Sequence, residues 1–173
     1  MSTDLLQATC DKFLGGQVQA YQPKKGYRSG SDAVLLAAAV NAQNGETCLE
    51  FGCGVGVASL CLAKRLAYEG INYTITGIDI QSTLIDLAQK NTDMNDLMQK
   101  PEFFVQDIKA KFSDWVHIQP SGFHHVFANP PYFRKIKVLP RRMRARRRRM
   151  WLIKLIWIFG SNVPPPALPE AGS

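Results

Sequence analysis

The sequence contains few residues of the kinds that build metal centres or disulfide frameworks. It has only three histidines and four cysteines in 173 residues, and no C-x-x-C pair occurs among Cys10, Cys48, Cys53 and Cys61. Its first residues also lack the basic and then apolar pattern of a secretory signal. We therefore expect reduced thiols, no bound metal and a cytoplasmic location. Nothing in the sequence indicates the oligomeric state.

Long apolar runs are also missing. The longest, residues 150–159, is interrupted by Lys154 and is shorter than the roughly 20 residues that cross a bilayer. We therefore expect no membrane span. With 46% hydrophobic and 20% charged residues, the composition is that of a soluble globular protein, and the length suits one domain or most of one.

Acidic residues are nearly absent from the C-terminal part of the chain. Residues 134–173 contain 11 basic residues and a single acid, Glu170, whereas residues 1–133 contain 10 basic and 13 acidic residues. The two parts carry net charges of +10 and −3, so the overall +7 comes from the tail. We therefore divide the chain into a main domain, 1–133, and an atypical tail, 134–173, that is basic and then proline-rich. The arginine run at 141–149 either binds RNA by counterion release or is an accidental solvated segment.

Hydrophobic periodicity in the main domain alternates between the strand and helix patterns. Four segments favour strands and three favour helices: strands at 47–51, 73–80, 101–105 and 123–128, and helices at 31–40, 57–68 and 83–94. This alternation predicts an α/β fold with a parallel sheet and right-handed crossovers. Ligands of such sheets bind outside the carboxyl ends of the strands. A glycine-rich turn, Asp79, Asp107 and Asn129 all lie at the carboxyl ends of predicted strands and should meet at that edge.

The glycine-rich turn has the pattern of one class of cofactor site. Gly52, Gly54 and Gly56 follow a strand and precede a helix, and Glu50 stands two residues ahead of them. A dinucleotide fingerprint, G-x-G-x-x-G, would require glycine at position 57, which is Val57. The G-x-G-x-G spacing instead resembles the first motif of class I S-adenosylmethionine-dependent methyltransferases. This resemblance implies a Rossmann-like, three-layer sandwich with a mostly parallel sheet and S-adenosyl-L-methionine as cofactor.

The carboxylates around the turn suit that cofactor. Its sulfonium is cationic and it carries no phosphate, so a nearby carboxylate such as Glu50 is tolerated. Asp79 is placed to accept hydrogen bonds from the ribose hydroxyls, and Asp107 from the adenine amino group. The alternative is that each acid only caps the helix after it. The expected cofactor-binding residues are Glu50, Gly52, Gly54, Gly56, Asp79 and Asp107.

The tetrapeptide Asn129-Pro130-Pro131-Tyr132 resembles the motif of methyltransferases that act on planar amino nitrogens: adenine, guanine or the glutamine amide. Such a nitrogen is a poor nucleophile because its lone pair is delocalised. The Asn129 side-chain carbonyl and the Pro130 backbone carbonyl would accept its hydrogens and favour a pyramidal nitrogen. The two prolines fix φ, and Tyr132 offers a stacking face to an extruded base. The alternative is a plain Asn-Pro turn.

The N-terminal part of the sequence favours one substrate among these amino nitrogens. Residues 11–16 and 22–40 resemble the bacterial tRNA (adenine-N6)-methyltransferases that modify the adenosine 3′ of the anticodon in a valine tRNA, and the resemblance runs from residue 11 to 133. It implies tRNA as the partner. The substrate-binding candidates are Lys24, Lys25, Tyr27 and Arg28, suited to phosphate contact and base stacking, although a solvated lysine-rich loop is the alternative. Two other functions stay open: methylation of rRNA, DNA or protein glutamine, and non-catalytic RNA binding through the arginine run.

The resemblance ends just after Phe133. A complete class I fold has seven strands, of which the predicted main domain supplies four. We therefore expect residues 134–173 to be the product of a shifted reading frame and the last strands to be missing. The strand at 123–128 would then form an unpaired edge beside exposed core, and catalysis would be impaired.

Overall fold

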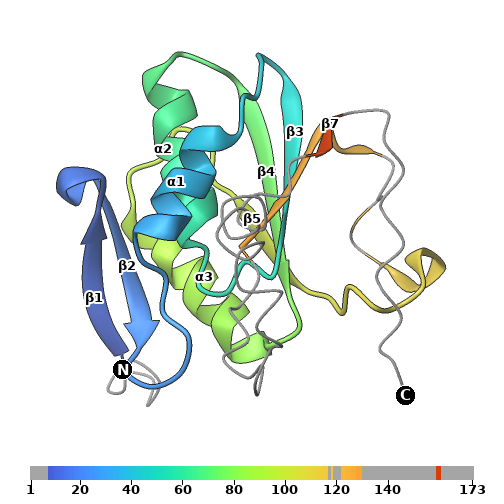
Figure 1. Ribbon diagram of the computed structural model, residues 1–173, viewed down its shortest axis with the longest axis horizontal. Coiled ribbons are helices and arrows are strands. Elements are labelled where there is room, and N and C mark those ends of the chain that lie inside the picture. The colour runs from blue at the N-terminus through green and yellow to red at the C-terminus, as the bar shows by residue number, and fades with distance from the viewer. Residues whose placement is uncertain (1–7, 117, 119–121, 130–158, 161–173) are drawn as a thin grey trace, which may run out of the picture.

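A computed structural model describes residues 8–116, 118, 122–129 and 159–160 of the chain (Figure 1). Its strands are β1 (Ala8–Phe13), β2 (Val18–Pro23), β3 (Glu46–Phe51), β4 (Tyr73–Asp79), β5 (Glu102–Val105), β6 (His125–Ala128) and β7 (Phe159–Gly160). The helices are α1 (Ser31–Ala39), α2 (Val57–Tyr68) and α3 (Ser82–Met94), with 3-10 turns η2 (Leu14–Gly16) and η3 (Phe112–Asp114). All four strands and three helices predicted from the sequence are present, each beginning within two residues of its expected start.

The central sheet has the strand order β5-β4-β3-β6-β7. Its first four strands are parallel, and only β7 runs antiparallel. β3 lies in the middle, where Cys48 pairs with Ile75 of β4 on one side and with His125 of β6 on the other. The predicted α/β fold with a mostly parallel sheet is therefore confirmed. Because these four strands are parallel, their carboxyl ends lie at one edge of the sheet.

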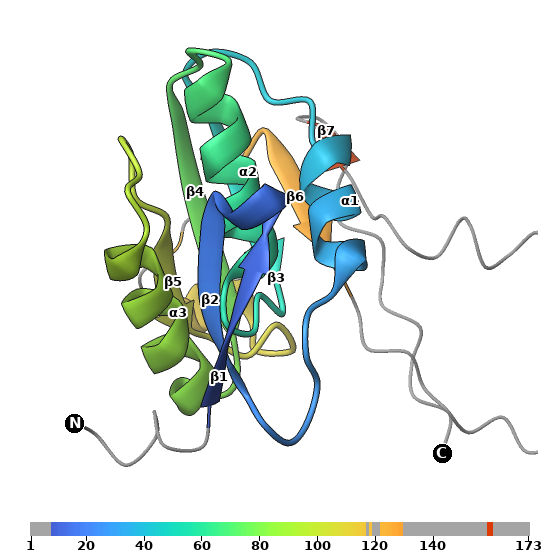
Figure 2. The ribbon, with the colours of Figure 1, turned by 90° about the vertical axis from the view of Figure 1, so that its left-hand side faces the viewer.

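The three helices cover one face of the sheet (Figures 1 and 2). The other face is covered by the chain between β5 and β6, whose described residues contain no α-helix. α2 is the most deeply buried helix, with Leu60, Leu62 and Leu66 inaccessible to solvent. On the other face Trp115 packs edge-to-face against Phe51, with ring centroids 6.2 Å apart. In the described residues, the third layer of the sandwich is therefore this segment with its 3-10 turn. Within the described part of the chain, no helix combines the length and apolarity needed to cross a membrane.

The edge beside β6 differs from the sequence-based expectation. We expected β6 to be an unpaired edge, but β7 pairs with it antiparallel, matching Val126 with Phe159 and His125 with Gly160. An edge strand presents free N–H and C=O groups, and any extended segment nearby can satisfy them. The prediction of an unpaired β6 was therefore wrong. It missed β7 because periodicity cannot identify so short a strand. The remainder of the tail lies outside the described residues, and its shifted reading frame and the domain boundary at residue 133 stay predictions.

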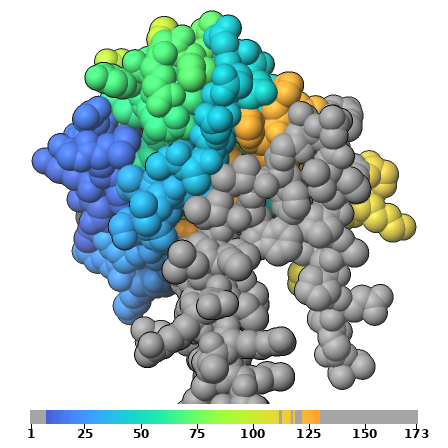
Figure 3. All heavy atoms as spheres, turned by 45° about the horizontal axis from the view of Figure 1, so that its top comes forward, coloured from blue at the N-terminus to red at the C-terminus, as the bar shows by residue number. Residues whose placement is uncertain are grey.

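An N-terminal hairpin that periodicity did not reveal packs against the helices on one side of the molecule (Figures 2 and 3). β1 and β2 pair antiparallel from Ala8 opposite Pro23 to Phe13 opposite Val18. The connecting 3-10 turn contains Gly15 and Gly16, both with positive φ. The alternate β2 residues Val18, Ala20 and Gln22 are buried, so this strand adds a face to the core.

Asn91 of α3 and Asn95, which directly follows the helix, hold the hairpin. Asn95 Oδ1 accepts from the Gln19 N–H (2.9 Å) while its Nδ2 donates to the Gln19 carbonyl (2.7 Å). Asn91 does the same with Tyr21, at 2.7 Å and 3.1 Å. Residues four apart on a helix and two apart on a strand both rise by about 6 to 7 Å, so the two side chains match the strand repeat. α3 thus substitutes for a neighbouring strand along β2.

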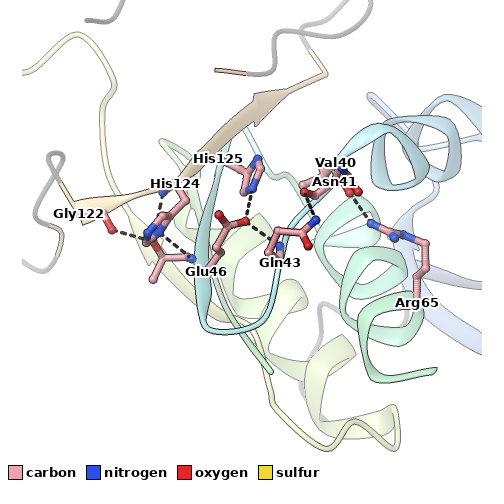
Figure 4. A network of polar contacts seen from close by, with 9 residues as sticks. Val40, Asn41, Gln43, Glu46, Arg65, Gly122, His124 and His125 are labelled. Carbon is pink, nitrogen blue, oxygen red and sulfur yellow. Dashed lines mark hydrogen bonds and ion pairs between the residues drawn. The ribbon is translucent and has the colours of Figure 1, made fainter. Parts of the chain in front are cut away.

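Two histidines lie at the amino ends of the strands, opposite the predicted site (Figure 4). His125 Nε2 lies 2.7 Å from Glu46 Oε2, and the Thr47 N–H donates to His124 Nδ1 at 3.2 Å. The Gln43 N–H and the His125 ring both hold the pKa of Glu46 below its ordinary value. These groups join the start of β6 to the start of β3 and leave the carboxyl ends of the strands for the candidate site.

Candidate functional site

The glycine turn after β3 has a backbone that only glycine adopts without strain. Gly52, Gly54 and Gly56 have φ of +64°, +56° and +82°, in the left-handed region. A Cβ on Gly56 would lie 2.7 Å from the ring of Phe103, so the start of α2 packs directly on β5. A Cβ on Gly52 or Gly54 would meet no atom within 4 Å among the described residues. The turn is therefore tight on its inner side and open above Gly52 and Gly54, as a cradle for a ligand requires.

Asp79 lies where β4 ends and fixes this turn. Its Oδ2 accepts from the Gly54 N–H and its Oδ1 from the Gln81 N–H, both at 3.0 Å. The side chain is only 9% exposed. An ionised carboxylate offers about four acceptor sites, so two remain after these backbone bonds. Asp79 can therefore hold the glycine turn and still accept hydrogen bonds from a diol placed above it.

Glu50 was expected among the cofactor-binding residues, and in the structure its carboxylate binds the start of α2. It is 2% exposed, and its Oε2 accepts from the Ser59 N–H (3.0 Å) and the Ser59 hydroxyl (2.5 Å). Ser59 is the third residue of α2, so the carboxylate satisfies an amide that the helix itself leaves without a partner. Burial raises the pKa of Glu50 to about 7, against the lowering effect of the Ser59 bonds, and the charge of Asp79 adds to the rise. Glu50 thus stabilises the turn indirectly, by binding the first turn of the helix that follows it.

Replacing Glu50 by glutamine should stabilise the protein at neutral and alkaline pH. The folded-state pKa of about 7 exceeds the ordinary value of 4.5, so the folded state holds the proton that the unfolded state has lost. Stability therefore falls as the pH rises between those values, by up to about 3 kcal/mol. Glutamine keeps an acceptor for Ser59 but cannot ionise.

Chemical unfolding of both proteins at about pH 5 and about pH 8 measures this difference. The advantage of Glu50→Gln should be larger at the higher pH. Parallel pH profiles of the two proteins would show that Glu50 does not titrate as proposed.

Asp107 follows β5 and lies near Asp79, because the Gln106 N–H donates to the Asp79 carbonyl at 2.9 Å. Its Oδ1 accepts from the Lys109 N–H at 2.8 Å, which closes a local turn. The structure thus brings the Gly52–Gly56 turn, Asp79 and Asp107 to one end of the sheet. Their contacts with the cofactor stay proposals.

Asn129, directly after β6, contacts the segment before α1. Its Nδ2 donates to the Tyr27 hydroxyl (2.8 Å) and to Asp32 Oδ2 in a short hydrogen bond. The Tyr27 hydroxyl also donates to Asp32 Oδ2 (2.9 Å). The Asn129 Oδ1 atom is buried and finds no hydrogen-bond partner among the described residues. Pro130, Pro131 and Tyr132 lie outside the described residues, so their expected roles stay predictions.

Asp32 belongs to the site but is not among the catalytic, cofactor-binding or substrate-binding residues predicted above. It stands 97 positions before Asn129 in the chain. Burial pushes the pKa of Asp32 upward, but hydrogen bonds from Asn129, Tyr27 and Gly30 outweigh this and hold it below its ordinary value. Its signals in the sequence were its place within the resembling segment 22–40 and in the first turn of the helix predicted at 31–40.

The basic loop before α1 divides into two parts. Lys24 and Lys25 are exposed and can reach a polyanion. Arg28 forms a short ion pair with Asp11 and donates to the Pro23 carbonyl at 3.0 Å, so its charge is used within the fold. Gln22 Nε2 donates to the same Asp11 carboxylate at 2.8 Å. Of the predicted phosphate contacts, the exposed Lys25 is therefore better placed than Arg28.

Comparisons with known proteins agree with this arrangement. Residues 48–143, more than half of the chain, match the family described as "Methyltransferase domain", so the match extends past residue 133, where we expected the family pattern to end. A tRNA1(Val) (adenine(37)-N6)-methyltransferase of Vibrio cholerae is 32% identical over 66% of this chain and 44% of its own length. The corresponding protein of Histophilus somni (strain 129Pt) is 31% identical over 72% and 50%. The chain thus spans about half the length of the curated relatives it matches.

A solved structure supports the fold. The T. thermophilus 16S rRNA N2 G1207 methyltransferase, in complex with AdoMet and guanosine, superposes with a TM-score of 0.54 at 19% identity, covering 78% of this chain and 35% of that one. The predicted cofactor, S-adenosyl-L-methionine, fits both the family and the open glycine turn. The parallel sheet, the glycine turn and the matched residues together show that this chain belongs to the methyltransferase domain family.

Proposed function

We propose that this protein methylates the exocyclic N6 of an adenosine in tRNA, at the position 3′ of the anticodon in a valine tRNA. The observation that carries the proposal is the buried Asn129 Oδ1 atom, which has no hydrogen-bond partner among the described residues at the carboxyl end of β6. Buried acceptors without a partner are rare, and a donor on a bound substrate would explain this one. The names of the relatives from Vibrio cholerae and Histophilus somni support adenine in tRNA as that ligand.

Asn129 would act on the amino group of the extruded base. When its Oδ1 accepts one amino hydrogen, the nitrogen lone pair is favoured out of the ring plane. S-adenosyl-L-methionine supplies an electrophilic methyl group on a cationic sulfur. The new C–N bond leaves a cationic amine whose proton is released readily, so the chain needs no strong general base. The Pro130 carbonyl as second acceptor and the Tyr132 ring as stacking face complete the proposal.

The residues that would hold the cofactor are those of the strand ends. The backbone from Gly52 to Gly56 would form the floor, Asp79 would accept from the ribose hydroxyls, and Asp107 from the adenine amino group. Glu50 would contribute indirectly, by capping α2 beneath the turn. Lys24 and Lys25 would contact tRNA phosphates. A tRNA substrate implies a cytoplasmic location.

The test is methyl transfer to two tRNAs that differ in one base. The full chain is incubated with methyl-labelled S-adenosyl-L-methionine and unmodified valine tRNA carrying either adenine or guanine next to the anticodon. We expect N6-methyladenosine, identified by mass spectrometry of the nucleosides, only in the first. Methylation of both tRNAs, or of rRNA, DNA or a glutamine peptide instead, would refute the substrate. RNA binding without cofactor binding by calorimetry would support the non-catalytic alternative.

A further inference from the structure

The side-chain amide of Asn129 is held in one orientation by its neighbours. An asparagine amide can exchange the positions of its nitrogen and oxygen by a half-turn, and neutral neighbours often accept either arrangement. Here one neighbour is the Asp32 carboxylate, which only accepts hydrogen bonds. The atom that faces Asp32 must therefore be Nδ2, and the second Nδ2 hydrogen is directed to the Tyr27 hydroxyl. The oxygen is left as the buried atom without a partner among the described residues.

Asp32 is itself fixed on both oxygens. Its Oδ1 accepts from the Gly30 N–H at 2.9 Å, and its Oδ2 accepts from the Tyr27 hydroxyl and from Asn129. The first bond belongs to the start of α1, where an acidic side chain is favoured in any case. The bonds on Oδ2 do not serve the helix. They connect α1 to a residue that follows β6.

The loop that carries Tyr27 is anchored from the hairpin. The buried Gln22 accepts from the Ser29 N–H at 2.7 Å and donates to the Ser29 carbonyl at 3.2 Å. This paired contact resembles a step of a strand ladder and fixes the backbone just before α1. Gln22 also donates to Asp11. The hairpin therefore holds the segment on which the two partners of Asn129 lie.

We propose that Asp32, assisted by Tyr27, is a positioning residue that keeps the Asn129 carboxamide oxygen available as the acceptor for the substrate amine. Without the carboxylate, the amide can turn and present its NH2 group to the amine, where two donors would face each other. Asp32 does not touch the substrate in this proposal and acts through Asn129. The proposal rests on the proposed function for its substrate, but the orientation of the amide is a property of the free protein.

Exchanging the two side chains tests the proposal. Asp32→Asn alone leaves two amides in contact, either of which can turn, and Asn129→Asp alone places two carboxylates against each other. The double variant Asp32→Asn with Asn129→Asp restores one donor and one acceptor, keeps an oxygen for the Gly30 N–H, and leaves a carboxylate oxygen for the substrate. We expect each single variant to lose about tenfold or more in kcat and the double variant to regain most of that loss. Affinity for S-adenosyl-L-methionine should stay within about twofold throughout.

A second readout does not depend on activity. The side-chain 15N–1H signals of Asn129 should show two hydrogen-bonded protons in the free wild-type protein, and Asp32→Asn should shift them and speed their exchange. Asp86→Asn on the exposed side of α3 is the matched control and should change neither signal nor kcat. Thermal unfolding of every variant identifies any loss that comes from stability alone.

The outcomes separate this proposal from the proposed function. A wild-type protein that binds S-adenosyl-L-methionine but neither methylates tRNA nor binds adenosine would refute the function, and the amide signals would still decide the orientation. Unchanged Asn129 signals in Asp32→Asn would overturn the positioning role. In an active enzyme, a double variant no better than the weaker single variant would overturn it as well.

Discussion

Replacing Asn129 by alanine should reduce methyl transfer by about a hundredfold or more, because it removes the side-chain acceptor that would polarise the substrate amine. The binding of S-adenosyl-L-methionine should be nearly unchanged, since the glycine turn and Asp79 are held by hydrogen bonds that do not involve Asn129. Single-turnover transfer of labelled methyl measures the first effect, and calorimetry measures the second. An alanine variant that is as active as the wild type would refute the mechanism.

The control for this experiment is Asn44→Ala. Asn44 is exposed, and its Oδ1 accepts a single hydrogen bond, from the Asn72 N–H at 2.9 Å. It lies in the turn before β3, at the amino end of the sheet. Loss of activity in both variants would indicate a general effect of the substitution and not the loss of an acceptor at the site.

Replacing Asn91 by alanine should destabilise the protein by about 2 to 4 kcal/mol, the largest effect on stability that we expect from a single polar residue here. Asn91 is fully buried and makes three hydrogen bonds: it accepts from the Tyr21 N–H and donates to the Tyr21 and Val55 carbonyls. The Val55 bond lies in the glycine turn. The variant therefore loosens the hairpin and the turn together, and its partners lose hydrogen bonds that the alanine cannot replace.

Urea unfolding measures the change, with Asn44→Ala again as the comparison, since its single exposed bond is worth about 1 kcal/mol or less. Hydrogen exchange adds a local readout. The amides of β2 should exchange faster in Asn91→Ala, whereas those of β3 should stay protected. If the two alanine variants have equal stability, the docking of β2 on α3 contributes nothing through Asn91.

The local parts of the site were predictable because each is encoded within a few residues. Glycines two apart after a strand predicted a turn of positive φ, and Gly52, Gly54 and Gly56 all adopt it. The order of strands and helices placed Asp79 at the end of its strand and Asp107 just after the next one, as expected. The position of Glu50 was not predictable in the same way. Its spacing from the glycines does not tell whether the carboxylate faces a ligand or the Ser59 amide, because that depends on how α2 packs on the sheet.

By itself, the sequence determined the alternation of strands and helices, the glycine turn and the family, because periodicity and backbone preference are properties of neighbouring residues. Only the tertiary structure decided which distant parts of the chain meet. It brings Asn129 to Asp32 and Tyr27. It also brings Asn91 to the β2 backbone and pairs β7 with β6. These pairs lie far apart in the chain, and nothing in one member specifies the other. Contacts of that kind are fixed by the packing of whole elements, so they follow from the fold and not from the motif.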